Sequence, residues 1–259
     1  MSNVDYTIPR GKLYFDQFTS GTTDATGERY LGHTPEISVG TSVEDIKHYN
    51  SDTAENALDK SVTLRVDRTL KFTLDSIDED NIAMFLLGSK STVTQTSGTV
   101  TDESMTTSAV LDRYYQMGDS TANPSGVKGV TAVSVKAGTL GSETTKTLTT
   151  DYTADLTNGR IYIVAGGAIT AGMSVLVTYT RTANSRVQII SGGTMIEGAF
   201  RHIADNKTGT NRNTFWPQVS LKPDGDFAMK GNDWQKVGFT ADILKLGTLA
   251  TTYVDGVPA

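Results

Sequence analysis

The chain has 259 residues, among them 40 Thr, 25 Gly, three His and no Cys. Without cysteine, disulfides, thiolate metal sites and cysteine nucleophiles are excluded. The 29 acidic and 23 basic residues give a formal net charge of −6, which argues against a uniformly basic nucleic-acid binder.

Threonine together with Val, Ile and Tyr favours strands over helices, so we expect a mainly β protein. The N-terminal MSNVDYTIPR lacks the basic and apolar segments of a secretory signal. The longest hydrophobic run, residues 82–87, is far shorter than the about 20 residues that span a bilayer. We therefore expect a soluble protein with no membrane partner.

Residues 41–60, TSVEDIKHYNSDTAENALDK, form a polar segment that we expect to be a long loop between two strands. Loops of about 20 residues are uncommon in compact domains and are usually functional or disordered. Val43, Ile46 and Tyr49 follow a helix-like spacing and offer apolar surface to bury. We favour an arm that packs on a neighbouring subunit; the alternative is a mobile surface loop.

The clearest pattern in the chain follows, over residues 61–74. Apolar and polar residues alternate strictly, as in a half-buried strand, with Arg68 as the one polar residue on the apolar face. Fourteen residues extend about 45 Å at ~3.3 Å per residue, which is long for a strand. The strand must bend between two sheets or project as a hairpin, and Arg68 marks a bulge, the emergence from the core, or an interface.

One helix is expected directly afterwards, between Asp78 and Gly88. Asp78 is placed to cap it, and Glu79 and Asp80 suit the positive end of the helix dipole. Ile77 and Ile82 are spaced as a hydrophobic staple, and Gly88 is expected to end the helix. One helix beside long strands predicts a β architecture with a single covering helix.

Residues 118–183 read as a separate unit, which starts with a linker-like stretch, residues 117–129, rich in Gly, Ser, Asn and Pro. Short strands are expected near 131–136, 146–152, 159–164 and 174–181, and Asn158-Gly159 predicts a type I′ hairpin turn. We expect a small β-sandwich inserted into a discontinuous main domain, residues 1–117 and 184–259. Further strands of that main domain are expected near 187–200, 215–222 and 233–243.

No group of residues predicts catalysis. His33, His48 and His202 lie far apart without metal-ligand spacing, and the acidic cluster at 75–80 is accounted for by the helix start. Asp224-Gly225-Asp226 lacks the further ligands of a calcium loop and reads as a turn. No nucleophile elbow, phosphate loop or dinucleotide fingerprint occurs. We expect no enzyme activity, no metal and no cofactor.

Two stretches resemble the tail tube proteins, or major tail proteins, of long-tailed bacteriophages. The first is GKLYFDQF…GERYLGHTPEISVGTSVEDIKHYN, followed by the alternating strand and the capped helix. The second is TGTNRNTFWPQVSLKPDGDFAMKGNDWQKVGFTADILK, residues 208–245. The insertion, with DYTADLTNGRIYIVAGGAITAGMSVLVTYT, is similar to immunoglobulin-like decorations of phage virion proteins, which are less typical of a plain tube subunit.

The resemblance implies a tail-tube-type β-sandwich or barrel-like subunit that forms hexameric rings stacked into a tube of the virion, assembled in the host cytoplasm. The tube surrounds a tape-measure protein, joins tail terminator and tail tip proteins, and conducts genomic DNA without binding it specifically. In that family the long early loop contacts the adjacent ring. We assign the subunit and ring interfaces to Val43, Ile46, Tyr49, Arg68, Phe215, Trp216 and Trp234.

Two other functions are weighed against this one. A glycan- or surface-binding module built on the insertion has few aromatic residues for sugar stacking, only Tyr152 and Tyr162 besides Tyr179, and no Trp. A hydrolytic tail component lacks a candidate set of catalytic residues. We therefore expect a structural protein.

Overall fold

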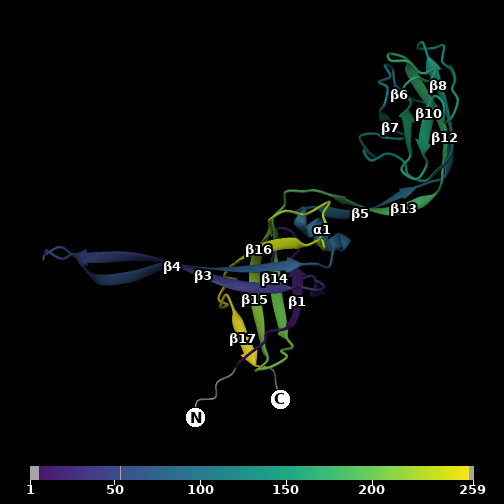
Figure 1. Cartoon of the computed structure of the whole chain (residues 1–259). Helices are drawn as coiled ribbons and strands as arrows, with labels where there is room; N and C mark the ends of the chain where they lie inside the picture. Colours follow the sequence, from purple (N-terminus) through teal and green to yellow (C-terminus); the bar gives the residue numbers. More distant parts are fainter. Residues whose placement is uncertain (1–5, 53, 257–259) are drawn as a thin grey trace. The chain divides into compact units, whose positions relative to one another are not determined.

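The computed structural model describes residues 6–52 and 54–256. Within them the chain is mainly β with one helix, as predicted. It forms two compact units, one from the residues up to 91 together with those from 189 onward, and one from residues 92–188 (Figure 1). Each unit has its own hydrophobic core.

The first unit is built on one open, antiparallel sheet of eight strands. Along the sheet the order is β2, β1, β14, β15, β16, β4, β3. β16 pairs with the C-terminal half of β15, and β17 pairs with its N-terminal end. The strands are β1 (Gly11–Gln17), β2 (Arg29–Tyr30), β3 (Glu36–Asn50), β4 (Ala57–Leu74), β14 (Ile196–Ala204), β15 (Arg212–Asp224), β16 (Val237–Ile243) and β17 (Tyr253–Gly256).

Residues 41–60, expected as a loop, belong mostly to β3 and β4. The two strands pair as an antiparallel hairpin from Glu36↔Thr73 out to Asn50↔Ala57. The projecting hairpin was one of the two outcomes predicted for the alternating strand. The polar composition of the segment hid the strand because both of its faces are exposed.

Aromatic and aliphatic side chains from every long strand meet in the core of the first unit. The ring of Phe72 lies 5.2 Å from that of Phe200 and 5.2 Å from that of Phe239, measured between centroids. Leu70 and Leu74, on either side of Phe72 along the same face of β4, are fully buried. This end of β4 therefore anchors the hairpin in the core.

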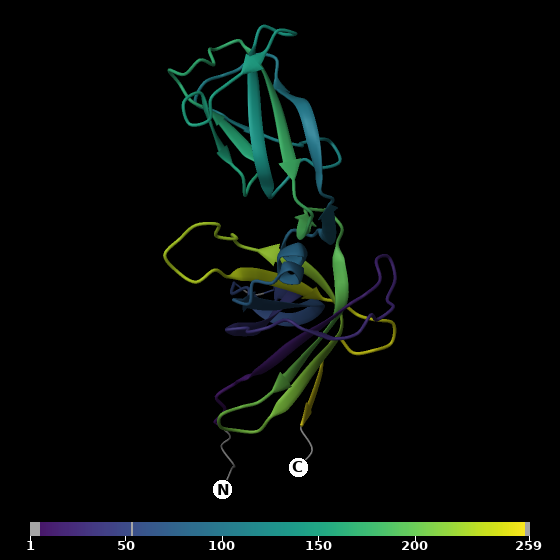
Figure 2. The ribbon, with the colours of Figure 1, turned by 90° about the vertical axis from the view of Figure 1, so that its right-hand side faces the viewer.

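Helix α1 (Glu79–Phe85) covers the sheet beside β16 (Figure 2), and its N-terminus is as predicted. The Asp78 carboxylate accepts a hydrogen bond from the backbone N–H of Asn81 at 2.7 Å. At the C-terminus Leu87, with φ +47°, takes the left-handed position expected of Gly88. Gly88 is required for another reason, because a Cβ there would lie 1.9 Å from the carbonyl oxygen of Ile190.

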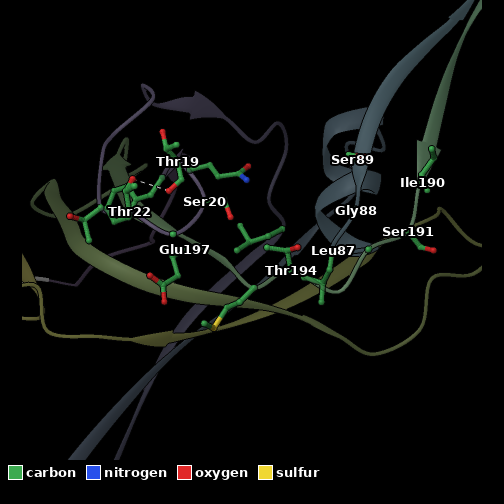
Figure 3. A pocket seen from close by; sticks show the side chains of 17 residues that line it. Thr19, Ser20, Thr22, Leu87, Gly88, Ser89, Ile190, Ser191, Thr194 and Glu197 are labelled. Atoms are coloured by element: carbon green, nitrogen blue, oxygen red, sulfur yellow. Dashed lines mark hydrogen bonds between the residues drawn. The ribbon is translucent and has the colours of Figure 1, made fainter.

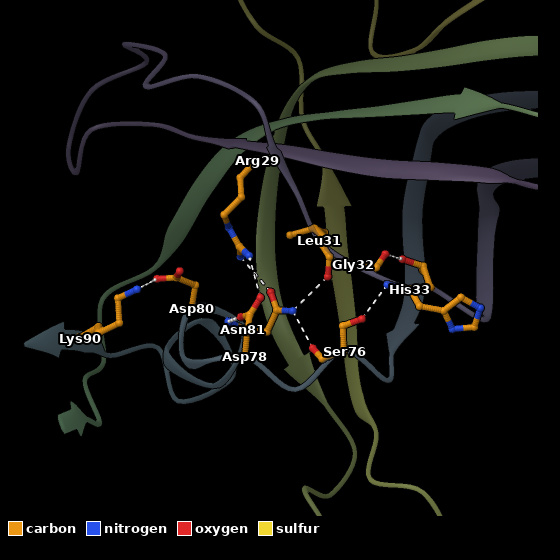
Figure 4. Close-up of polar contacts among 10 residues, drawn as sticks. Arg29, Leu31, Gly32, His33, Ser76, Asp78, Asp80, Asn81 and Lys90 are labelled. Carbon is orange, nitrogen blue, oxygen red and sulfur yellow. Dashed lines mark hydrogen bonds and ion pairs between the residues drawn. The ribbon is translucent and has the colours of Figure 1, made fainter. Parts of the chain in front are cut away.

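Asn81 joins the helix to the segment that precedes β3 (Figure 4). Its fully buried amide donates to the carbonyl oxygens of Leu31 at 3.0 Å and Ser76 at 2.8 Å. Its side-chain oxygen accepts from the Arg29 guanidinium at 2.9 Å. One side chain thus satisfies polar groups from two separate segments, residues 29–31 and Ser76.

The second unit is a β-sandwich of a three-stranded and a four-stranded sheet, with order β10–β11–β7 and β6–β12–β8–β9. Its core includes Ile161, Ile163, Val175, Val177 and Tyr179. The strands are β6 (Gly98–Thr106), β7 (Tyr114–Gln116), β8 (Val130–Gly138), β9 (Thr144–Thr145), β10 (Tyr152–Asp155), β11 (Arg160–Ile163) and β12 (Ser174–Arg181). The chain passes between the units through β5 (Ser89–Gln95) and β13 (Asn184–Ile190), which pair with each other.

The boundaries 118 and 183, expected for the insertion, lie inside this unit. β6 pairs with β12 and β7 pairs with β11, so residues 92–117 belong to the sandwich rather than to the main domain. The unit of residues 92–188 contains seven acidic and seven basic residues and is neutral. The whole formal charge of −6 therefore resides in the first unit.

Two local expectations inside the sandwich differ as well. Residues 146–151, expected as part of a strand, form a loop between β9 and β10, because the buried Asp151 carboxylate accepts the backbone N–H groups of Thr147 and Ala168. The Asn158-Gly159 hairpin is present, but only Gly159 has a positive φ, so the turn is not type I′. Asp155 instead holds this turn by accepting from the Asn158 backbone and side-chain amide.

Replacing Asn81 by Ala is expected to lower the free energy of unfolding of the first unit by about 2–4 kcal/mol, because two buried carbonyl groups lose their donor. Both Trp residues lie in this unit, so urea unfolding followed by Trp fluorescence reports on it alone. Asn56→Ala, at an exposed position, is the matched control and should stay within about 0.5 kcal/mol of the parent. Equal stability of Asn81→Ala and Asn56→Ala would contradict this role.

Candidate assembly interface

The most distinctive surface of the first unit is the far part of the β3–β4 hairpin, residues 42–67, which we call the arm. It extends away from the rest of the sheet (Figure 1). Every described residue in it is exposed except Asn50, which is half-buried. The arm therefore makes its contacts almost wholly within itself.

Seven large apolar side chains of the arm are between 42% and 58% exposed. They come from both strands and are Val43, Ile46, Tyr49, Leu58, Val62, Leu64 and Val66. An isolated two-stranded hairpin is only marginally stable in water. In this hairpin the exposure of apolar side chains to water is a further unfavourable contribution to its free energy. Such a surface is typical of an interaction site.

Register shifts distribute these side chains over both faces of the arm. Val43 lies opposite Val66, Ile46 opposite Val62, and Tyr49 opposite Leu58. Leu64 and Asp59 of β4 are extra residues that have no partner on β3. The side chains of β3 alternate without interruption, so Val43 and Tyr49 share one face while Ile46 is on the other. The arm can therefore bury apolar side chains on two sides.

Polar side chains hold the register between the apolar pairs. The Arg65 guanidinium lies 3.4 Å from the Glu44 carboxylate and 2.8 Å from that of Asp67. The Thr63 hydroxyl donates to Asp45 at 2.8 Å, and His48 Nδ1 lies 2.6 Å from an Asp59 oxygen. Exposed pairs of this kind contribute at most about 1 kcal/mol each, so they align the strands more than they stabilise them.

Arg68 marks the point where the hairpin leaves the core, one of the three roles predicted for it. Residues before it on β4 are exposed, whereas Leu70, Phe72 and Leu74 beyond it are buried. Its guanidinium donates to the Thr251 hydroxyl at 3.4 Å. Val43, Ile46 and Tyr49 are all exposed on the arm, but on a strand rather than with the helical spacing inferred from the sequence.

The three aromatic residues assigned to the interface lie in different environments. Trp216 is only 3% exposed and belongs to the core, so packing within the subunit accounts for it. Phe215 is half-buried beneath the Arg201 guanidinium, 4.4 Å from its ring centroid. Trp234 is 85% exposed on the loop between β15 and β16 and remains available to a partner.

The sequence also contains a signal for three further arm residues, Val62, Leu64 and Val66. The alternation over residues 61–74 places them on the apolar face of a half-buried strand, which predicts burial rather than exposure. The strand is longer than the core beneath it, and that excess length is the signal that part of its apolar face is exposed.

A cavity of about 660 Å³ lies at the base of the arm, and we call it the base cavity. The start of β3 contributes Ile37 and Val39, and the neighbouring strands contribute His202, Trp216 and Val254. Prolines 9 and 35 add further apolar wall, and Arg10 and Glu36 are the charged lining residues. Trp216 is one of these lining residues, and its indole N–H is buried without a hydrogen-bond partner among the described residues.

A second cavity, about 860 Å³, is lined by loop 19–23, by Leu87, Gly88 and Ser89 after the end of α1, and by residues between 190 and 197 (Figure 3). Its wall is mostly Thr, Ser and Gly, and Glu197 is its one ionisable side chain. Glu197 accepts a hydrogen bond from the Gln218 side chain at 3.2 Å. Nucleophile, base and metal ligands do not converge in this lining.

Histidines 33 and 48 each pair with a nearby aspartate, Asp75 and Asp59, at exposed positions. Across residues 6–52 and 54–256, no group of three or more His, Asp or Glu side chains is arranged to hold a metal ion. The helix in this part of the chain is too short to cross a membrane.

Comparison with known proteins gives one family. A family model described as "Protein of unknown function UCP028589" matches residues 6–249. No curated protein matches the chain.

Burial lowers the pKa of the His202 imidazole, which lines the base cavity with Arg10 and Glu36. Below the ordinary histidine pKa of about 6.5 the unfolded chain binds more protons at this site than the folded chain, so stability falls as the pH falls. We expect the first unit to lose more stability between pH 7.5 and 5.5 than the His202→Gln variant does. Urea unfolding followed by Trp fluorescence measures both, and identical losses would contradict the prediction.

Proposed function

The chain belongs to the family described as protein of unknown function UCP028589, and we propose that it is a structural subunit that assembles with copies of itself into stacked rings. The rings form a tube of the kind found in phage tails, as the sequence resemblance suggests. In this proposal the tube is part of the virion, surrounds a tape-measure protein, joins terminator and tip proteins at its ends, and conducts DNA.

The exposed apolar arm is the observation that carries this proposal. Full burial of one Val, Leu or Ile side chain is worth about 1.5–3 kcal/mol, and the seven arm side chains are each about half exposed. Covering them would yield on the order of 7 kcal/mol per arm. Association costs about 4–15 kcal/mol, so one arm holds a single partner only weakly.

Stacked rings remove this weakness. When a ring docks on another, several arms engage at once while the rotational and translational cost is incurred once. Apolar side chains on both faces of the arm also suit a position between two neighbouring copies. A ring stack offers such a position, whereas a simple dimer would cover one face.

Charge is compatible with a conduit for DNA. The first unit, which carries the arm, holds the whole net charge of −6, whereas the second unit is neutral. A net negative wall repels phosphates and lets DNA pass without being retained. The neutral sandwich would then be a decoration rather than part of the wall.

Replacing residues 44–65 by Asn-Gly tests the arm. The cut joins Val43 to Val66, which lie directly opposite each other, and Asn-Gly suits a two-residue turn. We expect the parent protein to form rings and tubes in negative-stain micrographs and the shortened protein to form none, with unchanged Trp fluorescence and cooperative unfolding.

Two further variants separate apolar contact from charge. Val62→Ser with Ile46→Ser should impair tube growth, whereas Lys47→Ser with Lys60→Ser at neighbouring exposed positions should leave it largely intact. A parent protein that stays monomeric at high concentration, or tubes that form without the arm, would overturn the proposed function.

One observation favours a second candidate function, glycan binding by the sandwich. Tyr114 lies beside Tyr162 on the outer face of the β10–β11–β7 sheet, with ring centroids 4.9 Å apart. Tyr114 belongs to this unit only because the unit begins at residue 92, so the aromatic surface is larger than the sequence-based boundary allowed. The Arg160 guanidinium lies 4.5 Å from the Tyr114 ring centroid and is paired with Asp155 at 2.7 Å. Aromatic rings beside charged hydrogen-bonding groups suit the two faces of a sugar ring.

Glycan-array binding by the full chain tests this candidate. Tyr114→Ala and Tyr162→Ala should each abolish any signal, because both remove the aromatic surface. Tyr6→Ala, at an exposed position of the first unit, is the control. An array without signal for the parent protein would exclude sugar binding at this face.

A further inference from the structure

We propose that the base cavity of one copy receives the tip of the arm of a second copy, with the paired Tyr49 and Leu58 side chains as its anchor. This inference rests on the proposed function and names the contact by which successive copies join. The occupant is therefore a second copy of this chain.

The cavity matches an amphipathic anchor. Its volume of about 660 Å³ lies within the range of ligand pockets, and Ile37, Val39, Trp216 and Val254 make much of its wall apolar. Tyr49 and Leu58 are each about half exposed at the far end of the arm. They lie directly opposite each other, so both can enter one cavity together.

Two buried polar groups of residues that line the cavity lack hydrogen-bond partners within the described ranges. The Trp216 indole N–H is buried without an acceptor, and the Thr252 hydroxyl, from another segment lining the cavity, is also buried without a partner. Leaving such a group unsatisfied is costly, so an occupant that carries an acceptor is favoured. Tyrosine has an apolar ring and a hydroxyl that can both accept and donate, which fits these two groups.

Geometry excludes the arm of the same copy. Val39 lines the cavity, and Tyr49 lies ten residues farther along the same strand, which corresponds to roughly 33 Å at ~3.3 Å per residue. An extended hairpin cannot place its tip at its own base. A second copy displaced along the arm by about that distance can, and repetition of the step gives a continuous stack.

One pair of opposite charges is available between the tip of the arm and the rim of the cavity. Asp52 is exposed at the tip of the arm. Arg10 lines the base cavity and forms no ion pair with any residue of the described ranges. A docked tip would place this carboxylate near this guanidinium at the rim.

The absence of cysteine makes a cross-linking test direct. Ser51→Cys combined with Val254→Cys places one thiol at the exposed tip, two residues from the anchor Tyr49, and one at the cavity. On oxidation of the assembled protein we expect a ladder of covalent multimers on a non-reducing gel, because each copy links to the next. An equimolar mixture of the two single variants should stop at dimers, and Ser51→Cys with Leu140→Cys, which lies in the second unit, should give no ladder.

A double-mutant cycle provides an independent measurement. Trp216→Phe removes the N–H and Tyr49→Phe removes the hydroxyl, and each should raise the protein concentration needed for assembly roughly five- to tenfold. If the two groups pair, the double variant should be little worse than either single variant. Trp fluorescence from the remaining Trp234 and cooperative unfolding verify that each variant folds.

The outcomes distinguish this inference from the function on which it rests. Tubes that depend on the arm, with no ladder and with additive effects of the two substitutions, would overturn the cavity as the receptor and leave the assembly proposal intact. Absence of any assembly by the parent protein would overturn both.

Discussion

The structure depends on one constraint: the apolar alternation of β4 continues farther than the core that can cover it. Leu70, Phe72 and Leu74 pack against the rings of Phe200 and Phe239 or beside them, and are buried. Beyond Arg68 the same strand continues with Val66, Leu64 and Val62 in solvent. Because the C-terminal half of β4 is fixed in the core, the direction in which its exposed N-terminal half projects is also fixed.

Packing and hydrogen bonds at the core end of the hairpin hold the arm in place. Phe72 is clamped between two aromatic rings, and the Asn81 amide connects α1 to the segments on either side of the hairpin. The arm itself is held only by strand pairing and exposed charge pairs, which contribute little. Its conformation is therefore stabilised from its root, and further stabilisation has to come from whatever covers its apolar pairs.

Sequence patterns predicted the elements whose causes are local. Period-two alternation revealed β4, and the Asp78 cap with its acidic first turn revealed α1, because strand faces and helix caps depend on residues a few positions apart. The unit boundary was missed by contrast, since β6 and β7 join the sandwich only by pairing with β12 and β11, more than forty residues away. Composition carries no information about such pairing.

At the candidate interface, too, the sequence predicted which residues are apolar but not where the fold places them. Trp216 and Trp234 looked equivalent in the sequence, yet one is buried in a central strand and the other is exposed on a loop, because position in the fold and not residue type decides exposure. Val43, Ile46 and Tyr49 were identified for their apolarity, which was sound, and given a helical periodicity, which was wrong. A spacing of three residues along β3 places these side chains on alternate faces, and the two register irregularities in β4 keep Val66, Val62 and Leu58 opposite them.

A protrusion and a matching cavity on the same chain have a consequence for assembly that neither has alone. Such a contact is heterologous, so each copy that docks presents a new cavity or a new arm, and growth along the arm has no internal end point. In the proposed assembly the weakness of a single arm contact is useful, because isolated copies would not polymerise readily whereas a closed ring, with several arms aligned, would. Length control for such a stack must come from outside the subunit, which is the role that the resemblance assigns to a tape-measure protein and to terminating proteins at the ends.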